Sequence, residues 1–159
     1  MHIISGTKSA KGLRFAIVVS TYHDFVTDGL QRGAVDALTE AGAVIEDLTI
    51  VFVPGAFEIP MAAQHAARGG RFDAVICLGC LIRGATAHFE YIASAVSHGI
   101  MAASAATGVP ITFGVLTTNS VEDAIERAAE GPSNKGREAA LAAMEMVAVV
   151  AQLGRPPAP

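Results

Sequence analysis

The side chains in this sequence that could bind a ligand or move a proton follow four short apolar runs. Their segments are STYHD, VPGAFE, LIRGATAH and LTTN. Together these segments hold hydroxyls, aromatic rings, two imidazoles, a carboxylate and a guanidinium: Tyr22, His23, Phe57, Glu58, Arg83, Thr86, His88 and Thr117. Aromatic side chains pack against planar molecules, and histidine transfers protons near neutral pH. This combination indicates a binding site for a flat polar ring and an anion.

His88 stands between a loop of small residues and an expected helix. It fits a proton-transfer role, and it equally fits a histidine that only hydrogen-bonds the backbone at the start of a helix. In the same loop, the backbone around Ala85 and Thr86 can present N–H groups to a phosphate. Arg83 can bind an anion or hold the loop through contacts with carbonyl groups. We favour the second role because Arg83 lies nearer the end of the preceding strand.

Two cations late in the chain, Arg127 and Lys135, are candidates to complete a phosphate site. They flank the irregular stretch AAEGPSN, and ordinary roles at helix ends fit both of them equally well. Glu58 can accept hydrogen bonds from a ligand, but a carboxylate there also compensates the dipole at a helix N-terminus, which is the role we favour. Tyr22 and Phe57 either stack on a planar ring or pack within their loops.

Cys77 and Cys80, in the segment CLGC, are the two cysteines of the chain. Zinc would need a second pair of ligands at suitable spacing, which the sequence lacks. A thioredoxin-type pair opens a helix, whereas Cys77 falls inside an expected strand. Both are therefore predicted to be small buried side chains. The sequence also lacks the dinucleotide, P-loop and G-x-S-x-G motifs, so we expect neither a metal nor a cofactor.

The composition points to a single domain that buries part of its surface in an oligomer. The chain has 159 residues, of which 52% are hydrophobic, 16% are charged and 30 are alanine, and its formal net charge is −4. This content excludes disorder, no apolar run reaches the about 18 residues of a membrane span, and no basic stripe indicates nucleic acid. The first residues lack the apolar core of a signal peptide, so we expect a cytoplasmic protein. Because soluble domains average about 25% charged residues, we expect a homo-oligomer.

Strand and helix patterns alternate along the chain, so one sheet can position all the residues above. We expect strands at residues 14–20, 48–53, 73–81 and 110–116, and helices at 24–42, from about 58, at 89–107, up to about 127 and at 135–153. This order predicts an α/β three-layer sandwich, with a four-stranded parallel sheet and helices on both faces. Ligands bind outside the carboxyl ends of such strands, where the four polar segments fall. Residues 1–7 are expected to add a short strand to the sheet edge of a neighbouring subunit.

Four separated segments resemble the 6,7-dimethyl-8-ribityllumazine synthase family (the riboflavin synthase beta-chain family). They are VPGAFEIP, GCLIRGATAHFEYI, TGVPITFGVLTT and the NKG at 134–136, and the similarity is nearly collinear up to about Val150. The resemblance implies a flavodoxin-like fold with one domain over residues 1–159, an N-terminal arm at 1–12 and a flexible tail at 154–159. It also implies the penultimate step of riboflavin biosynthesis, without metal or redox cofactor. In that step 5-amino-6-(D-ribitylamino)uracil condenses with 3,4-dihydroxy-2-butanone 4-phosphate.

The same resemblance assigns roles at the reacting end of the site. His88 matches the family's proton-transfer histidine. Arg127 matches the phosphate-binding arginine, helped by the loop backbone at Ala85 and Thr86. Lys135 matches a lysine near the phosphate and the ring closure. Positioning of two reactants and proton relay would then supply most of the catalysis.

Further residues match the family's contacts with the pyrimidine ring and the ribityl chain. They are Ala56, Phe57, Glu58, Leu81 and Ile82. Phe113 matches an aromatic residue supplied by the adjacent subunit, which implies a site shared across an interface.

The sequence departs from the family pattern at Tyr22 and His23, where Phe-Asn is common. Tyr22 can still stack on the substrate ring, but His23 places a larger, titratable ring near the ribityl chain, and Ala87 is a milder change. This departure keeps open a non-catalytic flavin-binding or shell-forming paralogue, although the retained His88 and the two cations favour catalysis. Family members form pentamers, some of which pack into icosahedral shells. We expect at least a pentamer, leave the shell open, and keep riboflavin synthase as a candidate partner.

Overall fold

Four apolar segments form the single parallel sheet that the sequence predicts. The computed structural model describes residues 1–154, and its strands are β1 (Phe15–Ser20), β2 (Leu48–Val53), β3 (Ala74–Ile82) and β4 (Ile111–Thr118). All neighbouring strands run parallel, in the order β2-β1-β3-β4. β1 and most of β3 are buried, which suits their continuous apolar runs because helices cover both faces of such a sheet.

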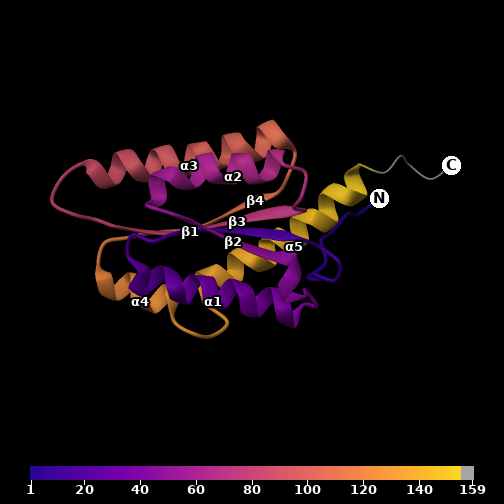
Figure 1. The fold of residues 1–159 in the computed structure, drawn as a ribbon, viewed down its shortest axis with the longest axis horizontal. Helices are drawn as coiled ribbons and strands as arrows, with labels where there is room; N and C mark the ends of the chain where they lie inside the picture. Colours follow the sequence, from indigo (N-terminus) through magenta and orange to yellow (C-terminus); the bar gives the residue numbers. More distant parts are fainter. Residues whose placement is uncertain (155–159) are drawn as a thin grey trace.

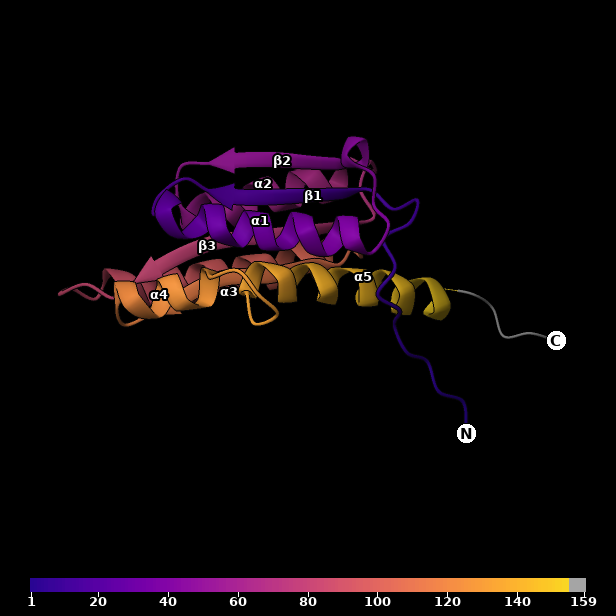
Figure 2. The ribbon, with the colours of Figure 1, turned by 90° about the horizontal axis from the view of Figure 1, so that it is seen from below.

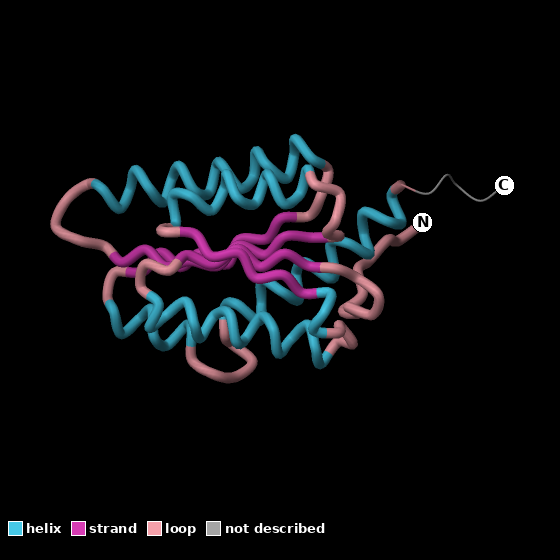
Figure 3. The backbone as a smooth tube through the Cα atoms, viewed as in Figure 1, coloured by secondary structure: helices cyan, strands magenta, loops and turns pink. Residues whose placement is uncertain are grey.

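Helices on both faces of the sheet complete the three-layer sandwich (Figures 1 and 3). On one face lie α2 (Ile59–Arg68) and α3 (His88–Thr107); on the other lie α1 (Asp24–Glu40), α4 (Val121–Ala128) and α5 (Lys135–Leu153). Two short 3-10 turns, η1 (Ile45–Asp47) and η2 (Ala56–Glu58), precede β2 and α2. The helix expected from about residue 58 therefore begins one residue later, after a 3-10 turn, with Pro60 tolerated in its first turn.

All four strands end on the same side of the molecule. In Figure 2 the arrows of β1, β2 and β3 point toward the long loop that joins β3 to α3. The register pairs Ser20 with Val53, and Ile82 with Thr118. The four polar segments that follow these strands consequently lie at one edge of the sheet, where ligands bind in open parallel sheets.

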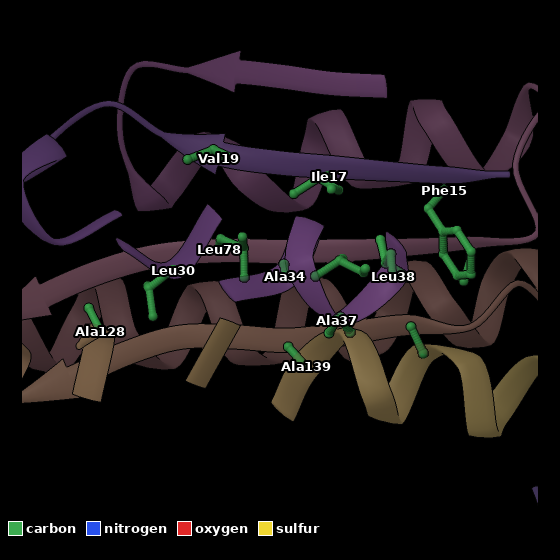
Figure 4. Packing of buried hydrophobic residues seen from close by; sticks show 14 of the residues in the cluster. Phe15, Ile17, Val19, Leu30, Ala34, Ala37, Leu38, Leu78, Ala128 and Ala139 are labelled. Atoms are coloured by element: carbon green, nitrogen blue, oxygen red, sulfur yellow. The ribbon is translucent and has the colours of Figure 1, made fainter. Parts of the chain in front are cut away.

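The larger of two apolar clusters holds β1 against α1. Phe15, Ile17 and Val19 point from β1 toward Leu30 and Leu38 of α1, and all five are at most 1% exposed (Figure 4). A second cluster packs the opposite face of the sheet against α2 and α3. The alternation along β1 therefore sends successive side chains into different layers of the core.

α5 approaches α1 closely at Gly136. A Cβ built on Gly136 would lie 1.9 Å from the backbone carbonyl oxygen of Leu30, so only a glycine fits there. The preceding Asn134 is 2% exposed. Its side-chain amide donates to the carbonyl oxygens of Gly29 at 3.1 Å and Ala128 at 2.8 Å, and its side-chain oxygen caps α5. Asn134 thereby ties together α1, the end of α4 and the start of α5.

The N-terminal arm lies beside α5. The side chain of Gln152 donates to the carbonyl oxygen of Ser5 at 2.8 Å, and the ammonium of Lys8 is 3.5 Å from the carboxylate of Glu145. Residues 1–10 form no strand within the described part of this single chain, so the extra strand on a neighbour's sheet stays a prediction. The predicted tail lies outside the described residues except for Gly154. Across residues 1–154, every helix is too short or too polar to cross a membrane.

The cysteine thiols are predicted to be inert in the folded protein. Both lie in β3 as unpaired, buried side chains, as the sequence predicts. Burial raises the pKa of Cys77, and it raises the pKa of Cys80 to about 11. At pH 8 a thiol with that pKa is thiolate in only about one molecule in a thousand. We expect an aromatic disulfide reagent to titrate no thiol in the native protein within minutes and two per chain in guanidinium. Rapid titration of a native thiol would contradict this.

Candidate active site

The connection from β1 to α1 is held against the connection from β2 to η2. The backbone N–H of Thr21 donates to the carbonyl of Val53 at 2.9 Å, and that of Tyr22 donates to the carbonyl of Pro54 at 3.1 Å. These bonds continue the β1–β2 ladder beyond both strands. They place the Tyr22 side chain, which is 68% exposed, beside the turn that carries Phe57, which is 59% exposed. Both rings are therefore open to contact with a planar ligand.

His23 has a left-handed backbone conformation, with φ at 63°. It stands at the N-cap of α1 without a capping hydrogen bond from its side chain. Its ring meets the edges of the Tyr22 and Phe25 rings, with centroids 4.5 and 5.6 Å apart. Partial burial lowers the pKa of His23, so its ring is neutral at pH 7 and presents one donor and one acceptor.

Substitutions at His23 should separate backbone strain from ligand contact. Glycine adopts the left-handed region freely and alanine does not, so His23→Gly is expected to be about 1 kcal/mol more stable than His23→Ala. Urea unfolding measures this difference, and equal stabilities would contradict it. His23→Asn keeps a side chain that tolerates this conformation but removes the ring. We expect it to change the dissociation constant for riboflavin; an unchanged constant would show that the histidine is neutral for binding.

η2 turns the chain so that Glu58 faces the site. The carboxylate folds over Gly55, where a built Cβ would lie 3.1 Å from Glu58 Oε2. Glu58 occupies the N-cap position of α2 but makes no capping hydrogen bond. Among the described residues its side chain has no hydrogen-bond partner, so its oxygens remain available to N–H or O–H groups of a ligand.

The loop after β3 leads directly into α3, whose first residue is His88. Ala87 precedes it at the N-cap and offers no side-chain capping hydrogen bond. The imidazole of His88 is exposed. It makes no hydrogen bond to the backbone of the described residues. Arg83 holds the loop, as we favoured, but through the side chains of Glu90 and Asn119 rather than through carbonyl groups.

A large cavity of about 850 Å³ opens where these segments meet. Its volume lies in the range of small-molecule sites, which are mostly apolar with a few polar groups. Nine of the predicted site residues line it: Tyr22, His23, Ala56, Phe57, Glu58, Leu81, Ile82, Thr86 and His88. Ala85 lies between Gly84 and Thr86, which both line the cavity.

A smaller cavity of about 410 Å³ lies along β4 and holds the other predicted residues. They are Phe113, Thr117, Arg127 and Lys135. The guanidinium of Arg127 donates to the backbone carbonyl of Asp123 at 2.9 Å and lies 3.6 Å from its carboxylate. Lys135 Nζ lies 2.8 Å from both carboxylate oxygens of Glu138. The cavity thus combines an exposed aromatic ring with two cations.

The single chain does not bring the predicted phosphate groups into one cavity. The loop at Ala85 and Thr86 borders the large cavity, whereas Arg127 and Lys135 border the small one. Thr112 also lines the small cavity, but its hydroxyl is buried and has no hydrogen-bond partner among the described residues. β4 is an edge strand, so this cavity lies at an open margin of the sheet.

Sequence reasoning missed several lining residues. In the large cavity they include Phe89, Tyr91, Ile92 and Val121. The first three follow His88 directly, so their place in the first turns of the same helix was an available signal. Glu138, in the small cavity, stands three residues after Lys135, a spacing that pairs side chains on a helix. Among residues 1–154, no group of three or more His, Cys, Asp or Glu side chains lies together as a metal site would need.

Two comparisons with known proteins give the same family name. A family model described as 6,7-dimethyl-8-ribityllumazine synthase matches residues 12–151. A curated protein of Syntrophus aciditrophicus (strain SB), named 6,7-dimethyl-8-ribityllumazine synthase, is 52% identical over 151 residues, which is 95% of this chain and 98% of that protein. The match therefore includes both cavities.

Proposed function

Since this chain belongs to the 6,7-dimethyl-8-ribityllumazine synthase family, we propose how its residues catalyse the synthesis of 6,7-dimethyl-8-ribityllumazine. The protein is a transferase of riboflavin biosynthesis with a flavodoxin-like fold. It condenses 5-amino-6-(D-ribitylamino)uracil with 3,4-dihydroxy-2-butanone 4-phosphate to give 6,7-dimethyl-8-ribityllumazine. An imine forms with loss of water, phosphate is eliminated, and the ring closes with loss of a second water. Nothing supports the alternative of a non-catalytic paralogue.

The pyrimidine binds in the large cavity, where aromatic rings and backbone groups converge. Tyr22 and Phe57 expose their rings there, which suits stacking on a planar heterocycle. Leu81 and Ile82 border the same space at the end of β3. Glu58 accepts hydrogen bonds from the ribityl hydroxyls, because its carboxylate has no partner in the described chain. The volume is the observation that carries this assignment, since about 850 Å³ accommodates a substituted pyrimidine.

His88 moves protons between the reacting atoms. Its imidazole lines the cavity and has no structural hydrogen bond to break. An exposed imidazole can both donate and accept a proton through its ring nitrogens, as general acid–base catalysis requires. The attacking amine belongs to the substrate, so the enzyme needs no nucleophile of its own. Most of the rate enhancement then comes from holding the two reactants in the reactive orientation, and proton transfer by His88 supplies the rest.

The phosphate binds between two subunits. We place Ala85 and Thr86 of one subunit opposite Phe113, Arg127 and Lys135 of the next, because these groups border separate cavities in one chain. An edge strand with an open cavity beside it is also a natural contact surface.

The apolar surface supports assembly into at least a pentamer. Tyr91 and Met101 on α3 are 76% and 71% exposed, and Val150 and Leu153 on α5 are 39% and 66% exposed. Exposed apolar surface of this extent marks interaction sites. We propose that neighbouring subunits cover both helices and receive the N-terminal arm on their sheet edge. Electron microscopy would distinguish a pentamer from an icosahedral shell, and riboflavin synthase stays a candidate partner.

We place the reaction in the cytoplasm. The two buried thiols are unpaired, which suits a reducing compartment.

The decisive test supplies both substrates to the purified protein. Lumazine fluorescence and released phosphate should rise together and in equal amounts, because each turnover yields one of each. If neither exceeds the uncatalysed background, the proposed catalysis is wrong. Phosphate release without lumazine would show decay of the phosphate substrate instead of condensation.

A further inference from the structure

We propose that Arg83 is a positioning residue that sets the first turn of α3 and, through it, the imidazole of His88. The proposal rests on the proton-transfer role given to His88 above. Arg83 does not border the large cavity, so it does not touch the substrate there. It acts on the first turn of α3, where His88 and Phe89 border the cavity.

Three elements meet at the Arg83 side chain. Its Nη1 pairs with Glu90 Oε1 in the first turn of α3, and its Nε donates to Asn119 Oδ1 at 3.1 Å, in the connection from β4 to α4. Its guanidinium lies over the ring of Phe89, 4.5 Å from the centroid. Its backbone N–H donates to the carbonyl of Thr118 at 2.9 Å. One residue therefore joins the end of β3 to α3 and to the end of β4.

Little else holds this part of the site. Residues 83–88 are all exposed. Within the described chain, the backbone from 84 to 87 makes one hydrogen bond, from the N–H of Tyr91 to the carbonyl of Ala87 at 3.4 Å. The N-cap of α3 has no side-chain hydrogen bond. Arg83 contacts Phe89 and Glu90, the two residues that follow His88. These contacts supply the restraint that a cap would otherwise give.

The contacts are suited to orientation more than to stability. The side chains of Arg83 and Glu90 are 45% and 50% exposed, and exposed ion pairs contribute little to the free energy of unfolding. A planar guanidinium can nevertheless pair, donate and stack at the same time, which a lysine ammonium cannot do. Loss of Arg83 should therefore let the first turn of α3 shift while the fold persists.

A double-mutant cycle with His88 tests the proposal. We expect Arg83→Gln to lower kcat about 5- to 50-fold, because small displacements of a catalytic group are costly. In a His88→Ala background the same substitution should lower kcat less than about 2-fold, since the positioned group is gone. Arg83→Lys keeps only the ion pair and should recover part of the loss. An equal loss in both backgrounds would overturn the proposal.

Two further measurements separate positioning from stability. Amide hydrogen exchange at residues 84–91 should accelerate in Arg83→Gln while exchange in the strands stays unchanged. The matched control is Arg71→Gln, which removes a guanidinium 5.2 Å from the ring of Phe72 at the opposite end of β3; its kcat should equal that of the wild type. If Arg83→Gln lowers only the melting temperature and leaves kcat unchanged, the positioning role is wrong. An inactive wild type would instead refute the proposed function.

Discussion

A mixture of His88→Ala and Arg127→Ala subunits, unfolded and refolded together, is expected to regain about a quarter of the wild-type activity. Each variant alone should be strongly impaired. Removing the proton-transfer group should slow turnover about 10- to 100-fold. Removing Arg127 should raise the KM for the phosphate substrate by about 10- to 100-fold, because a charge-assisted hydrogen bond contributes about 1.5–3 kcal/mol.

The recovery follows from the two separate cavities. If a site combines the large cavity of one subunit with the small cavity of its neighbour, a mixed ring contains sites in which both contributions are intact. With random assembly, about one interface in four pairs an intact His88 with an intact Arg127. If each site were built within one chain, every site would carry one defect and the mixture would show only the average of the two residual rates.

A matched mixture controls for refolding artefacts. His88→Ala and Glu58→Ala both alter the large cavity, so co-assembly leaves a defect in every large cavity. That mixture should not recover beyond the average of its components. Recovery there, or its absence in the first mixture, would contradict a site shared between subunits.

Gly136→Ala is expected to destabilise the fold by about 3 kcal/mol or more, at the upper end of overpacking penalties. The added methyl would meet the backbone of Leu30 at 1.9 Å from its carbonyl oxygen and 2.6 Å from its carbonyl carbon. A backbone cannot rotate away as a side chain can, so α1 and α5 would have to separate. Urea unfolding measures the loss, and failure to accumulate folded protein would agree with it.

Gly69→Ala is the control for this substitution. Its built Cβ meets nothing closer than 3.4 Å, the carbonyl oxygen of Ala66, and its φ of −68° suits alanine. The variant should differ from the wild type by less than about 1 kcal/mol. If Gly136→Ala were as stable as Gly69→Ala, the close approach of α1 and α5 would not be a real constraint.

The strands and helices were predictable because their signals are local. The run from Phe15 to Ser20 is continuously apolar and enriched in β-branched residues, as expected for a strand covered on both faces. The cap of α4 also depends only on residues close in the sequence: Ser120 Oγ accepts from the backbone N–H of Asp123 at 3.1 Å. Family motifs supplied the site residues, which periodicity alone does not identify.

The arrangement of the site could not be predicted from these signals. Arg127 and the loop at Ala85 border different cavities of one chain, and sequence spacing carries no information about that separation. The positive φ of His23 occurs next to Tyr22, whose backbone N–H is bonded to the carbonyl of Pro54, a residue distant in the sequence. The side-chain partners of Arg83 likewise depend on tertiary contacts between three elements.

The buried amide of Asn134 has a thermodynamic consequence for ligand binding. Its bonds to Gly29 and Ala128 fix the segment between Arg127 and Lys135 when the chain folds, so the entropy of ordering these cations is lost before any substrate arrives. The loop at 84–87 has almost no such restraint and would lose its freedom on binding. Calorimetry of inorganic phosphate should therefore show an unfavourable binding entropy that originates mainly from ordering of the loop. Asn134→Ala should make the binding entropy more unfavourable, because Arg127 and Lys135 would then also have to be ordered on binding.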